Sequence, residues 1–216
     1  MTGRLKRRVA VLGASGGVGR HIVERLLAAG FQAVCQTRSA EKLADLAQLA
    51  EIHAFDPRDK DRLSHFVRGV DAVIFALGTD RFTATTLFSE TTAALIAAMK
   101  EQHVARLIAI TGVGAGDTRG HGGFLYNWII FPLFTRKRYA DKTRQEELIA
   151  ASGLDWTIIR PAPFSNGPVT DELEVHTVIR PETQLSRITR DEVAAFVVAQ
   201  LDTDQYMHER PFIGHR

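Results

Sequence analysis

A glycine-rich run near the start of the chain is the feature with the clearest chemistry. It reads Gly13-Ala14-Ser15-Gly16-Gly17-Val18-Gly19, directly after an apolar stretch and directly before a helical pattern. Glycine lets the backbone approach a diphosphate closely, and a helix N-terminus offers N–H groups and a positive dipole end. A plain strand-to-helix turn that needs glycine for packing is the alternative. The context favours dinucleotide binding, with these residues at the diphosphate: Gly13, Ser15, Gly16, Gly17, Val18 and Gly19.

A second signal lies at the end of the next predicted strand, about 20 residues further along the chain. A carboxylate there would bind the ribose 2′-hydroxyl of NAD, but the chain reads Gln36-Thr37-Arg38-Ser39 and has no acid before Glu41. A guanidinium suits a 2′-phosphate instead. The alternative is a solvated loop arginine. The missing acid and the presence of Arg38 together predict NADP(H), with Ser39 and Lys42 assisting.

Two further turns are expected to line the adenosine. Asp56 follows the third predicted strand and can accept a hydrogen bond from the adenine amino group, cap the helix that Pro57 begins, or do both. The run Ala76-Leu77-Gly78-Thr79 ends the fourth strand, where the backbone should pass close to the adenosine. A plain turn explains the glycine of this run equally well.

These motifs are placed on a regular alternation of short apolar runs and helical patterns. The runs AVIFA and LIAI are continuous rather than alternating, which is typical of strands covered on both faces. Strands are predicted at 9–12, 32–37, 52–55, 71–77, 106–110 and 156–160, and helices at 18–27, 41–49, 59–68, 87–99, 142–151 and 193–201. This order predicts an α/β fold: a Rossmann-type, doubly wound parallel sheet with helices on both faces, and residues 1–216 as a single NAD(P)-binding domain.

The alternation breaks in two segments, at about 112–140 and 162–190, which follow the fifth and sixth strands. Ligands of open α/β sheets bind beyond the carboxyl ends of the strands, so both irregular segments are expected to line the substrate side. The stretch 124–134 concentrates aromatic residues. We interpret this stretch as a hydrophobic lid or pocket wall, with a core helix and a subunit contact as the alternatives.

Composition and charge argue against several other classes of protein. Among 216 residues, 27 Lys and Arg face 25 Asp and Glu, and the one basic cluster, at residues 4–8, is interpreted as a solvated tail. The single cysteine, Cys35, lies in an apolar run and is interpreted as a buried structural thiol. No apolar run has the length of a signal-peptide core or a membrane span, and no histidine pair has zinc-ligand spacing. We therefore expect a cytoplasmic monomer or homodimer without metal, nucleic acid or membrane partners.

Several segments together resemble the atypical short-chain dehydrogenases, and within them the NmrA-like and flavin reductase (biliverdin reductase B) types. These segments are GASGGVGR, TRSAEK, DAVIFALGT, Lys142 with the nearby EELIAASGLDWTIIRP, and DEVAAFVVAQL. The resemblance implies that Thr111 lies near the nicotinamide and that Lys142 holds the nicotinamide ribose. It also implies that the segment Pro161, Ala162 and Pro163 passes beneath the nicotinamide.

The chain departs from these families at catalytic positions. Short-chain dehydrogenases pair a tyrosine with a lysine four residues later, but Arg138 occupies that place and Tyr139 is shifted by one residue. On a helix this shift rotates the side chain by roughly 100°, so Tyr139 reaches the pocket only if the helix begins later. Gly112 and Pro163 stand where the flavin reductase type has a serine and a histidine.

With the tyrosine out of register, the sequence favours an acceptor that needs no dedicated acid. Thr111 and Lys142 are the main polar candidates for catalysis, with Tyr139 as a third. The leading prediction is an NADPH-dependent oxidoreductase that transfers hydride to a flavin, quinone or similar flat, conjugated small molecule. One alternative is an NADP(H)-binding redox sensor of NmrA type. A nucleotide-sugar epimerase or dehydratase ranks last, because those relatives have an intact Tyr-x-x-x-Lys and a larger C-terminal domain.

Overall fold

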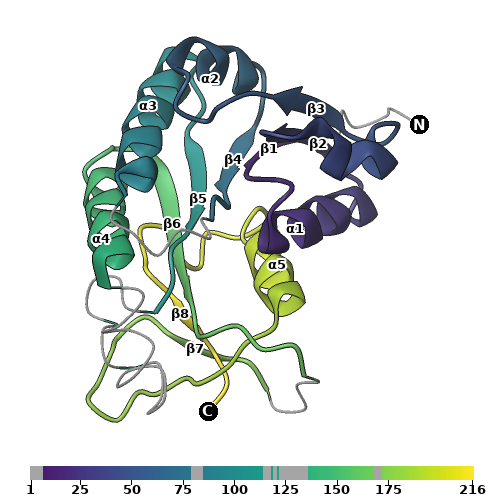
Figure 1. Cartoon of the computed structure of the whole chain (residues 1–216). Helices are drawn as coiled ribbons and strands as arrows, with labels where there is room; N and C mark the ends of the chain where they lie inside the picture. The colour runs from purple at the N-terminus through teal and green to yellow at the C-terminus, as the bar shows by residue number, and fades with distance from the viewer. Residues whose placement is uncertain (1–6, 79–84, 114–117, 119–120, 122–135, 168–171) are drawn as a thin grey trace.

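The computed structural model describes residues 7–78, 85–113, 118, 121, 136–167 and 172–216, with the backbone alone at 136–139. An eight-stranded sheet runs through it in the order β3-β2-β1-β4-β5-β6-β8-β7 (Figure 1). The strands are β1 (Arg8–Leu12), β2 (Gln32–Thr37), β3 (Glu51–Ala54), β4 (Ala72–Phe75), β5 (Arg106–Ile110), β6 (Asp155–Pro161), β7 (Glu174–His176) and β8 (Phe212–Gly214). The first six strands have the 3-2-1-4-5-6 order of a doubly wound nucleotide-binding sheet, so the predicted α/β architecture is confirmed.

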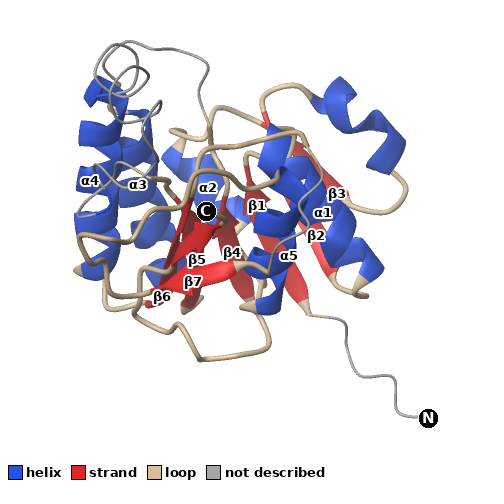
Figure 2. Ribbon diagram, turned by 90° about the horizontal axis from the view of Figure 1, so that it is seen from below, coloured by secondary structure: helices blue, strands red, loops and turns tan. Residues whose placement is uncertain are grey.

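Helices cover both faces of this sheet, as Figure 2 shows from below. The helical segments are α1 (Gly17–Ala28), η1 (Ala40–Leu46), α2 (Lys60–Phe66), α3 (Leu87–Glu101), α4 (Arg136–Ala150) and α5 (Arg190–Ala199). Helices α1 and α5 pack together against one face, and α2, α3 and α4 cover the other.

Double coverage explains why the strands are continuously apolar. Val9 and Val11 of β1 enter the core beneath α1 and α5, whereas Ala10 and Leu12 enter the core on the opposite face. All four side chains are buried. Because successive residues of a strand point to opposite faces, a strand between two helical layers needs apolar residues at every position.

Two helical segments differ from the prediction in type or extent. The segment after β2 is a 3-10 helix rather than an α-helix, with a non-helical backbone at Leu43. Its buried residues, Leu43 and Leu46, are three apart, which matches the three residues per turn of that helix. The helix before β6 starts at Arg136, six residues before the predicted start at Lys142.

The C-terminal edge of the sheet was not predicted. β8 pairs in parallel with β6, and β7 pairs antiparallel with β8, so the sheet is mixed at this end. Each of these strands has three residues, too few for a hydrophobic period to be detected. Part of the segment predicted as irregular is thus joined to the sheet: Ile188 N–H donates to Pro163 O at 3.0 Å, and Ala162 N–H to Ile213 O at 2.9 Å.

The cysteine is buried, as predicted. Cys35 lies in β2 with no exposed surface. Burial, together with the nearby charge of Glu51, raises the pKa of its thiol to about 12. A thiol with such a pKa is almost entirely protonated at neutral pH, which leaves a packing role.

Among the residues described, no helix is long and apolar enough to cross a membrane. The described side chains also contain no cluster of three His, Cys, Asp or Glu that could hold a metal ion.

Candidate functional site

The predicted coenzyme residues follow the carboxyl ends of five neighbouring strands. Gly13 follows β1, Arg38 follows β2, Asp56 lies just beyond β3, Ala76 follows β4 and Thr111 follows β5. These strands pair in parallel, so their carboxyl ends lie along one edge of the sheet. The strand order reverses between β1 and β4, and this is where open α/β sheets bind nucleotides.

The loop after β1 and the turn after β4 are in direct contact at this reversal. Gly13 has a φ of 80°, in the left-handed region that favours glycine. A Cβ at Gly13 would also lie 2.9 Å from the carbonyl oxygen of Ala76 and 3.0 Å from Cα of Leu77. Gly13 therefore brings the two loops together and allows close approach of their backbones.

The other two glycines of the spacing pack against Gly13. Gly16 N–H donates to Gly13 O at 2.9 Å. A Cβ at Gly19 would lie 2.1 Å from the same oxygen, far inside van der Waals contact. Packing alone thus requires glycine at 13 and 19, so glycine spacing by itself does not separate a plain turn from a coenzyme loop.

The N-terminus of α1 differs in its capping from the N-termini of α2 and α5. Helix α1 has Gly16 as its N-cap, no capping side chain and no acidic residue in its first turn. By contrast, Asp59 caps α2 by accepting from Arg62 N–H at 3.1 Å, and Thr189 and Glu192 form a capping box on α5. The first-turn N–H groups of α1 are therefore available to an external acceptor such as a phosphate.

Gln36 holds the glycine loop in place. Its buried side chain accepts from Gly13 N–H at 3.0 Å through Oε1 and donates to Phe55 O at 2.7 Å through Nε2. Its backbone carbonyl accepts from Ala14 N–H at 2.9 Å. The β1–β2 register places Gln36 beside Leu12, so this contact follows from strand pairing. Gln36 is not among the residues predicted from the sequence, although a polar residue in an apolar strand indicates such a role.

Thr37 connects the glycine loop to the turn that carries Arg38. Its hydroxyl lies 2.8 Å from Ser15 Oγ and accepts from Ser39 N–H at 3.1 Å. The side chain is buried at the end of β2. The hydroxyl of Ser39 in turn donates to Glu41, which lowers the pKa of that carboxyl group. Thr37 thus fixes the relative positions of the glycine loop and the turn that carries Arg38.

Replacing Thr37 with valine is expected to lower the free energy of unfolding by about 1–2 kcal/mol and to weaken NADPH binding. Valine keeps the shape but leaves the Ser39 N–H and the Ser15 hydroxyl without this partner. Thr177→Val, at an exposed position, is the control and should stay within about 0.5 kcal/mol. Urea denaturation and calorimetric titration measure both effects, and a cost no larger than that of the control contradicts the linking role.

Arg38 is exposed directly after β2, and Asp56 lies nearby with its carboxylate engaged. Arg58 donates to Asp56 through Nε at 3.0 Å and Nη2 at 2.7 Å, and its backbone N–H donates at 3.0 Å. These bonds lower the pKa of Asp56 to about 2, with a smaller contribution from the charge of Arg38. The prediction that Asp56 caps the next helix is wrong, because α2 begins at Lys60 and Asp59 caps it. The adenine contact stays a prediction.

Thr111 and Lys142, distant in sequence, meet at the end of β5. The Lys142 ammonium group donates to the backbone carbonyl of Thr111 and lies 5.0 Å from the ring centre of Phe88. Both residues are buried. Asp141, the neighbour of Lys142, accepts from Phe88 N–H at 2.9 Å and so attaches α4 to the start of α3.

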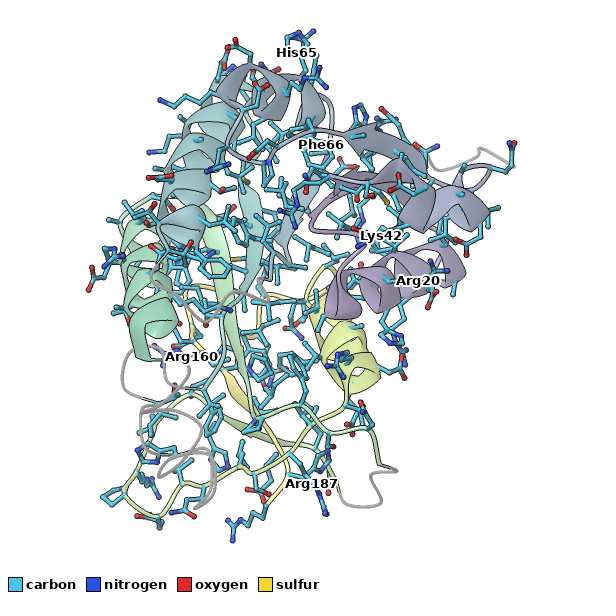
Figure 3. The ribbon with its side chains drawn as sticks, in the orientation of Figure 1. Arg20, Lys42, His65, Phe66, Arg160 and Arg187 are labelled. Carbon is cyan, nitrogen blue, oxygen red and sulfur yellow. The ribbon has the colours of Figure 1, made fainter. Side chains whose placement is uncertain are left out.

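A buried ion pair, which was not predicted from the sequence, lies behind Thr111. The Thr111 hydroxyl donates to Glu146 Oε1 at 2.6 Å. Glu146 also accepts from Arg160 Nε at 3.1 Å and Nη2 at 2.6 Å. Arg160 ends the apolar run of β6 and faces α4 (Figure 3), and the ion-paired side chains are 5% and 4% exposed. Two features of the sequence could have indicated this pair: an arginine at the end of an apolar strand, and an acidic residue one helical turn after Lys142.

The structure describes some of the remaining predicted residues. Pro161 ends β6, where its carbonyl accepts from Val113 N–H at 3.0 Å, and Ala162 and Pro163 follow directly. Leu77 is partly buried and Gly78 exposed.

Thr79, the aromatic stretch 124–134 and the side chain of Tyr139 lie outside the described residues. The backbone of Tyr139 belongs to α4, which begins at Arg136, so the later helix start that would bring Tyr139 into register does not occur.

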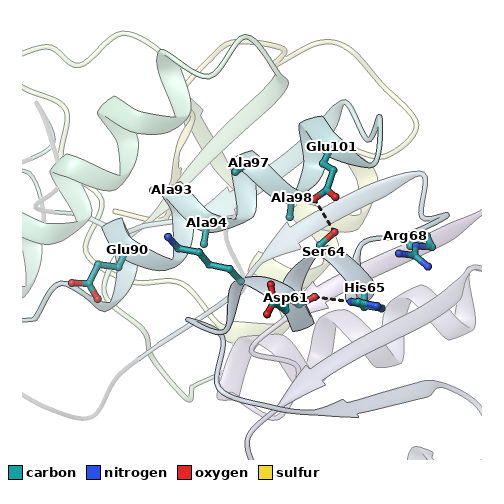
Figure 4. Close-up of a pocket in the computed structure, with 11 residues that line it drawn as sticks. Asp61, Ser64, His65, Arg68, Glu90, Ala93, Ala94, Ala97, Ala98 and Glu101 are labelled. Atoms are coloured by element: carbon teal, nitrogen blue, oxygen red, sulfur yellow. Dashed lines mark hydrogen bonds between the residues drawn. The ribbon is translucent and has the colours of Figure 1, made fainter.

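A separate groove of about 610 Å³ lies between α2 and α3 (Figure 4). A row of alanines from α3 forms its floor, and Ser64 donates to Glu101 at 2.9 Å across one end. None of the predicted site residues lines this groove. The groove is therefore distinct from the edge of the sheet where the predicted coenzyme residues lie.

Comparison with known proteins bears directly on the coenzyme. Residues 13–204 match a family model described as NAD(P)H-binding. An uncharacterised chloroplastic protein of Arabidopsis thaliana is 30% identical over 207 residues, which are 90% of this chain and 72% of that protein. An uncharacterised sugar epimerase of Bacillus subtilis is 28% identical over 206 residues, which are 90% of this chain and 88% of that protein.

The solved structure of ChuY from Escherichia coli O157:H7, described as an anaerobilin reductase, has the same fold. It superposes with a TM-score of 0.77 at 22% identity and covers 96% of this chain and 97% of ChuY. At that identity the likeness supports the fold alone. The family match, which spans most of the chain, confirms the predicted resemblance: this protein belongs to the NAD(P)H-binding family.

Proposed function

We propose that this protein is an NADPH-dependent reductase of a flat, conjugated acceptor such as a flavin or quinone. The observation that carries the proposal is the hydrogen bond from the Thr111 hydroxyl to Glu146. The single hydroxyl proton of Thr111 is donated to Glu146, and the Lys142 ammonium group donates to a backbone carbonyl. The Thr111 hydroxyl is therefore not positioned to donate a proton to an alkoxide, as carbonyl reduction needs. An acceptor that takes its proton from solvent fits this arrangement.

The residues of the edge divide the work of such a reaction. The first-turn amides of α1 seat the diphosphate, Arg38 binds the 2′-phosphate and Lys142 holds the nicotinamide ribose. When bound, NADPH supplies the hydride. The segment Pro161 to Pro163, at the end of β6, excludes water beneath the nicotinamide. The description of ChuY as a reductase agrees with this class of reaction, and the sugar epimerase of Bacillus subtilis is the competing precedent.

The choice of NADPH over NADH is tested at Arg38. Arg38→Ala is expected to weaken NADPH binding by about 1.5–3 kcal/mol, the range for a lost hydrogen bond to a charged group. NADH binding should be nearly unchanged, because NADH lacks the 2′-phosphate. Isothermal titration with each coenzyme measures both values. Arg68→Ala, at an exposed position in the turn after α2, controls for the loss of one positive charge.

Equal losses for the two coenzymes would contradict the phosphate role of Arg38. A loss of NADPH affinity in Arg68→Ala of similar size would assign the effect to net charge instead.

The reaction itself is tested with a panel of acceptors. Purified protein should oxidise NADPH, followed by absorbance, in the presence of FMN, FAD, riboflavin or a quinone, and should leave simple aldehydes and ketones unreduced. Thr111→Val should retain most of the activity, because the hydroxyl proton is not delivered to the acceptor. Normal NADPH binding with no turnover across the panel would overturn the reductase proposal and favour a coenzyme-binding redox sensor. A large loss of turnover in Thr111→Val would contradict the solvent-proton route.

A further inference from the structure

Arg190 approaches the diphosphate loop from the opposite end of the chain. It is the first residue of α5, and its guanidinium lies on the backbone of Gly17, the first residue of α1. A Cβ at Gly17 would be 2.9 Å from Arg190 Nε and 3.2 Å from its Cδ. Glycine at position 17 therefore makes room for this arginine, which packing against Gly13 does not explain.

The base of the arginine is held firmly. Thr189 and Glu192 form the capping box of α5, so the backbone on both sides of Arg190 is fixed. Asp191 binds Arg25 of α1 through two hydrogen bonds of 2.8 and 2.5 Å. Helix α5 is thus attached to the helix whose N-terminus Arg190 overlies.

Among the described residues, the guanidinium group of Arg190 contacts only uncharged partners. Nη1 donates to Asn166 Oδ1 at 3.0 Å, and the guanidinium carbon lies 4.9 Å from the ring centre of Phe164, which is 44% exposed. Within the described part of the chain no carboxylate pairs with Arg190. The positive end of α1, whose first turn is uncapped, is its neighbour. The guanidinium and the helix N-terminus are both positive, so together they attract an anion.

We propose that Arg190 is a coenzyme-positioning residue that binds the diphosphate of NAD(P)H from the side opposite to the α1 amides. In the free protein Asn166 and Phe164 hold the guanidinium over the loop. When the coenzyme binds, the guanidinium exchanges the neutral amide oxygen for phosphate oxygens, which its planar fork matches. This exchange links the segment after β6 to the occupancy of the diphosphate loop.

The proposal concerns a different phosphate from the one assigned to Arg38. NADH and NADPH share the diphosphate, whereas the 2′-phosphate belongs to NADPH alone. The proposal depends on coenzyme binding, which the family establishes, and not on the identity of the acceptor. An absence of turnover with every acceptor of the panel would therefore not contradict the role of Arg190.

Fragments of the coenzyme separate the two arginines. Isothermal titration of Arg190→Ala with NADPH, NADH, 5′-ADP and 2′-AMP should give about 10- to 100-fold weaker binding of the first three, which carry a diphosphate. Binding of 2′-AMP, which lacks it, should be unchanged. Arg38→Ala should show the reverse pattern, with a loss for NADPH and 2′-AMP and none for NADH and 5′-ADP.

Two further variants test the geometry. Arg190→Lys keeps the charge but loses the fork, so its affinity for NADH should lie between those of the wild type and Arg190→Ala. Asn166→Ala removes the partner of the free state, so it should not weaken binding of NADH. Unchanged NADH and 5′-ADP affinities in Arg190→Ala would overturn the proposal. So would an equal loss for 2′-AMP, because that result indicates general damage to the site.

Discussion

Gly19→Ala is expected to abolish coenzyme binding at accessible concentrations. The added Cβ would lie 2.1 Å from the carbonyl oxygen of Gly13, the atom that also accepts from Gly16 N–H. Neither atom belongs to a flexible side chain, so the loop itself must move. Displacement of the first-turn amides removes at least two hydrogen bonds to phosphate, about 3–6 kcal/mol in total, or more than about 100-fold in affinity. The strain should also lower the free energy of unfolding by about 1–3 kcal/mol.

The matched control for this substitution is Gly167→Ala. Nothing lies within 4 Å of a Cβ built at Gly167, and its φ is not in the left-handed region. This variant should keep both its stability, within about 0.5 kcal/mol, and its affinity for NADPH. Calorimetric titration and urea denaturation are the measurements. A Gly19→Ala protein that binds NADPH like the wild type would refute the assignment of the loop as the diphosphate site.

Arg160→Met is expected to lower the free energy of unfolding by about 3–5 kcal/mol. It leaves the buried carboxylate of Glu146 with the Thr111 hydroxyl at 2.6 Å and Arg210 Nε at 4.0 Å. Desolvation of a carboxylate is costly without close, well-aligned donors. The double variant Arg160→Met with Glu146→Leu removes both charges and should recover most of the loss, apart from about 1 kcal/mol for the partner lost by Thr111.

The exposed ion pair between Arg58 and Asp56 provides the control for this experiment. It has similar two-point geometry, but its side chains are 57% and 48% exposed, so Arg58→Met should cost less than about 1 kcal/mol. Urea denaturation of the two singles and the double gives the coupling energy between Arg160 and Glu146. If Arg160→Met costs no more than Arg58→Met, the buried pair does not support the Thr111 side of the site.

That the candidate coenzyme residues share one edge of the sheet could be predicted, because it depends on local sequence and on parallel topology. A glycine loop between a strand and a helix places Gly13 and Gly19 wherever the strand ends. Once the strands are parallel, Arg38 and Thr111 must share that edge. The error at Asp56 has a local cause. Pro57 resembles the first residue of a helix, but the chain makes another turn before Asp59 provides the cap.

The residues whose hydrogen bonds connect the loops at this edge of the sheet could not be predicted from the sequence. Gln36 and Thr37 act through neighbours in β1 and the glycine loop, and Glu146 acts through β5 and β6. Arg190 reaches a loop more than half the chain away. Their hydrogen-bond partners are defined by tertiary packing, on which a one-dimensional pattern carries no direct information.

The sequence by itself determined the alternation of strands and helices, the position of the glycine loop and the absence of a carboxylate directly after β2. Hydrophobic periodicity and glycine spacing are local properties of the sequence, so they can be detected without knowledge of the tertiary packing. Only the tertiary structure decided which polar groups are already bonded: Thr111 to Glu146, Gln36 to Gly13, and Arg190 to Asn166 above the loop. A hydrogen bond needs two groups within about 3 Å in the right direction, and for residues distant in sequence only the folded chain sets that distance.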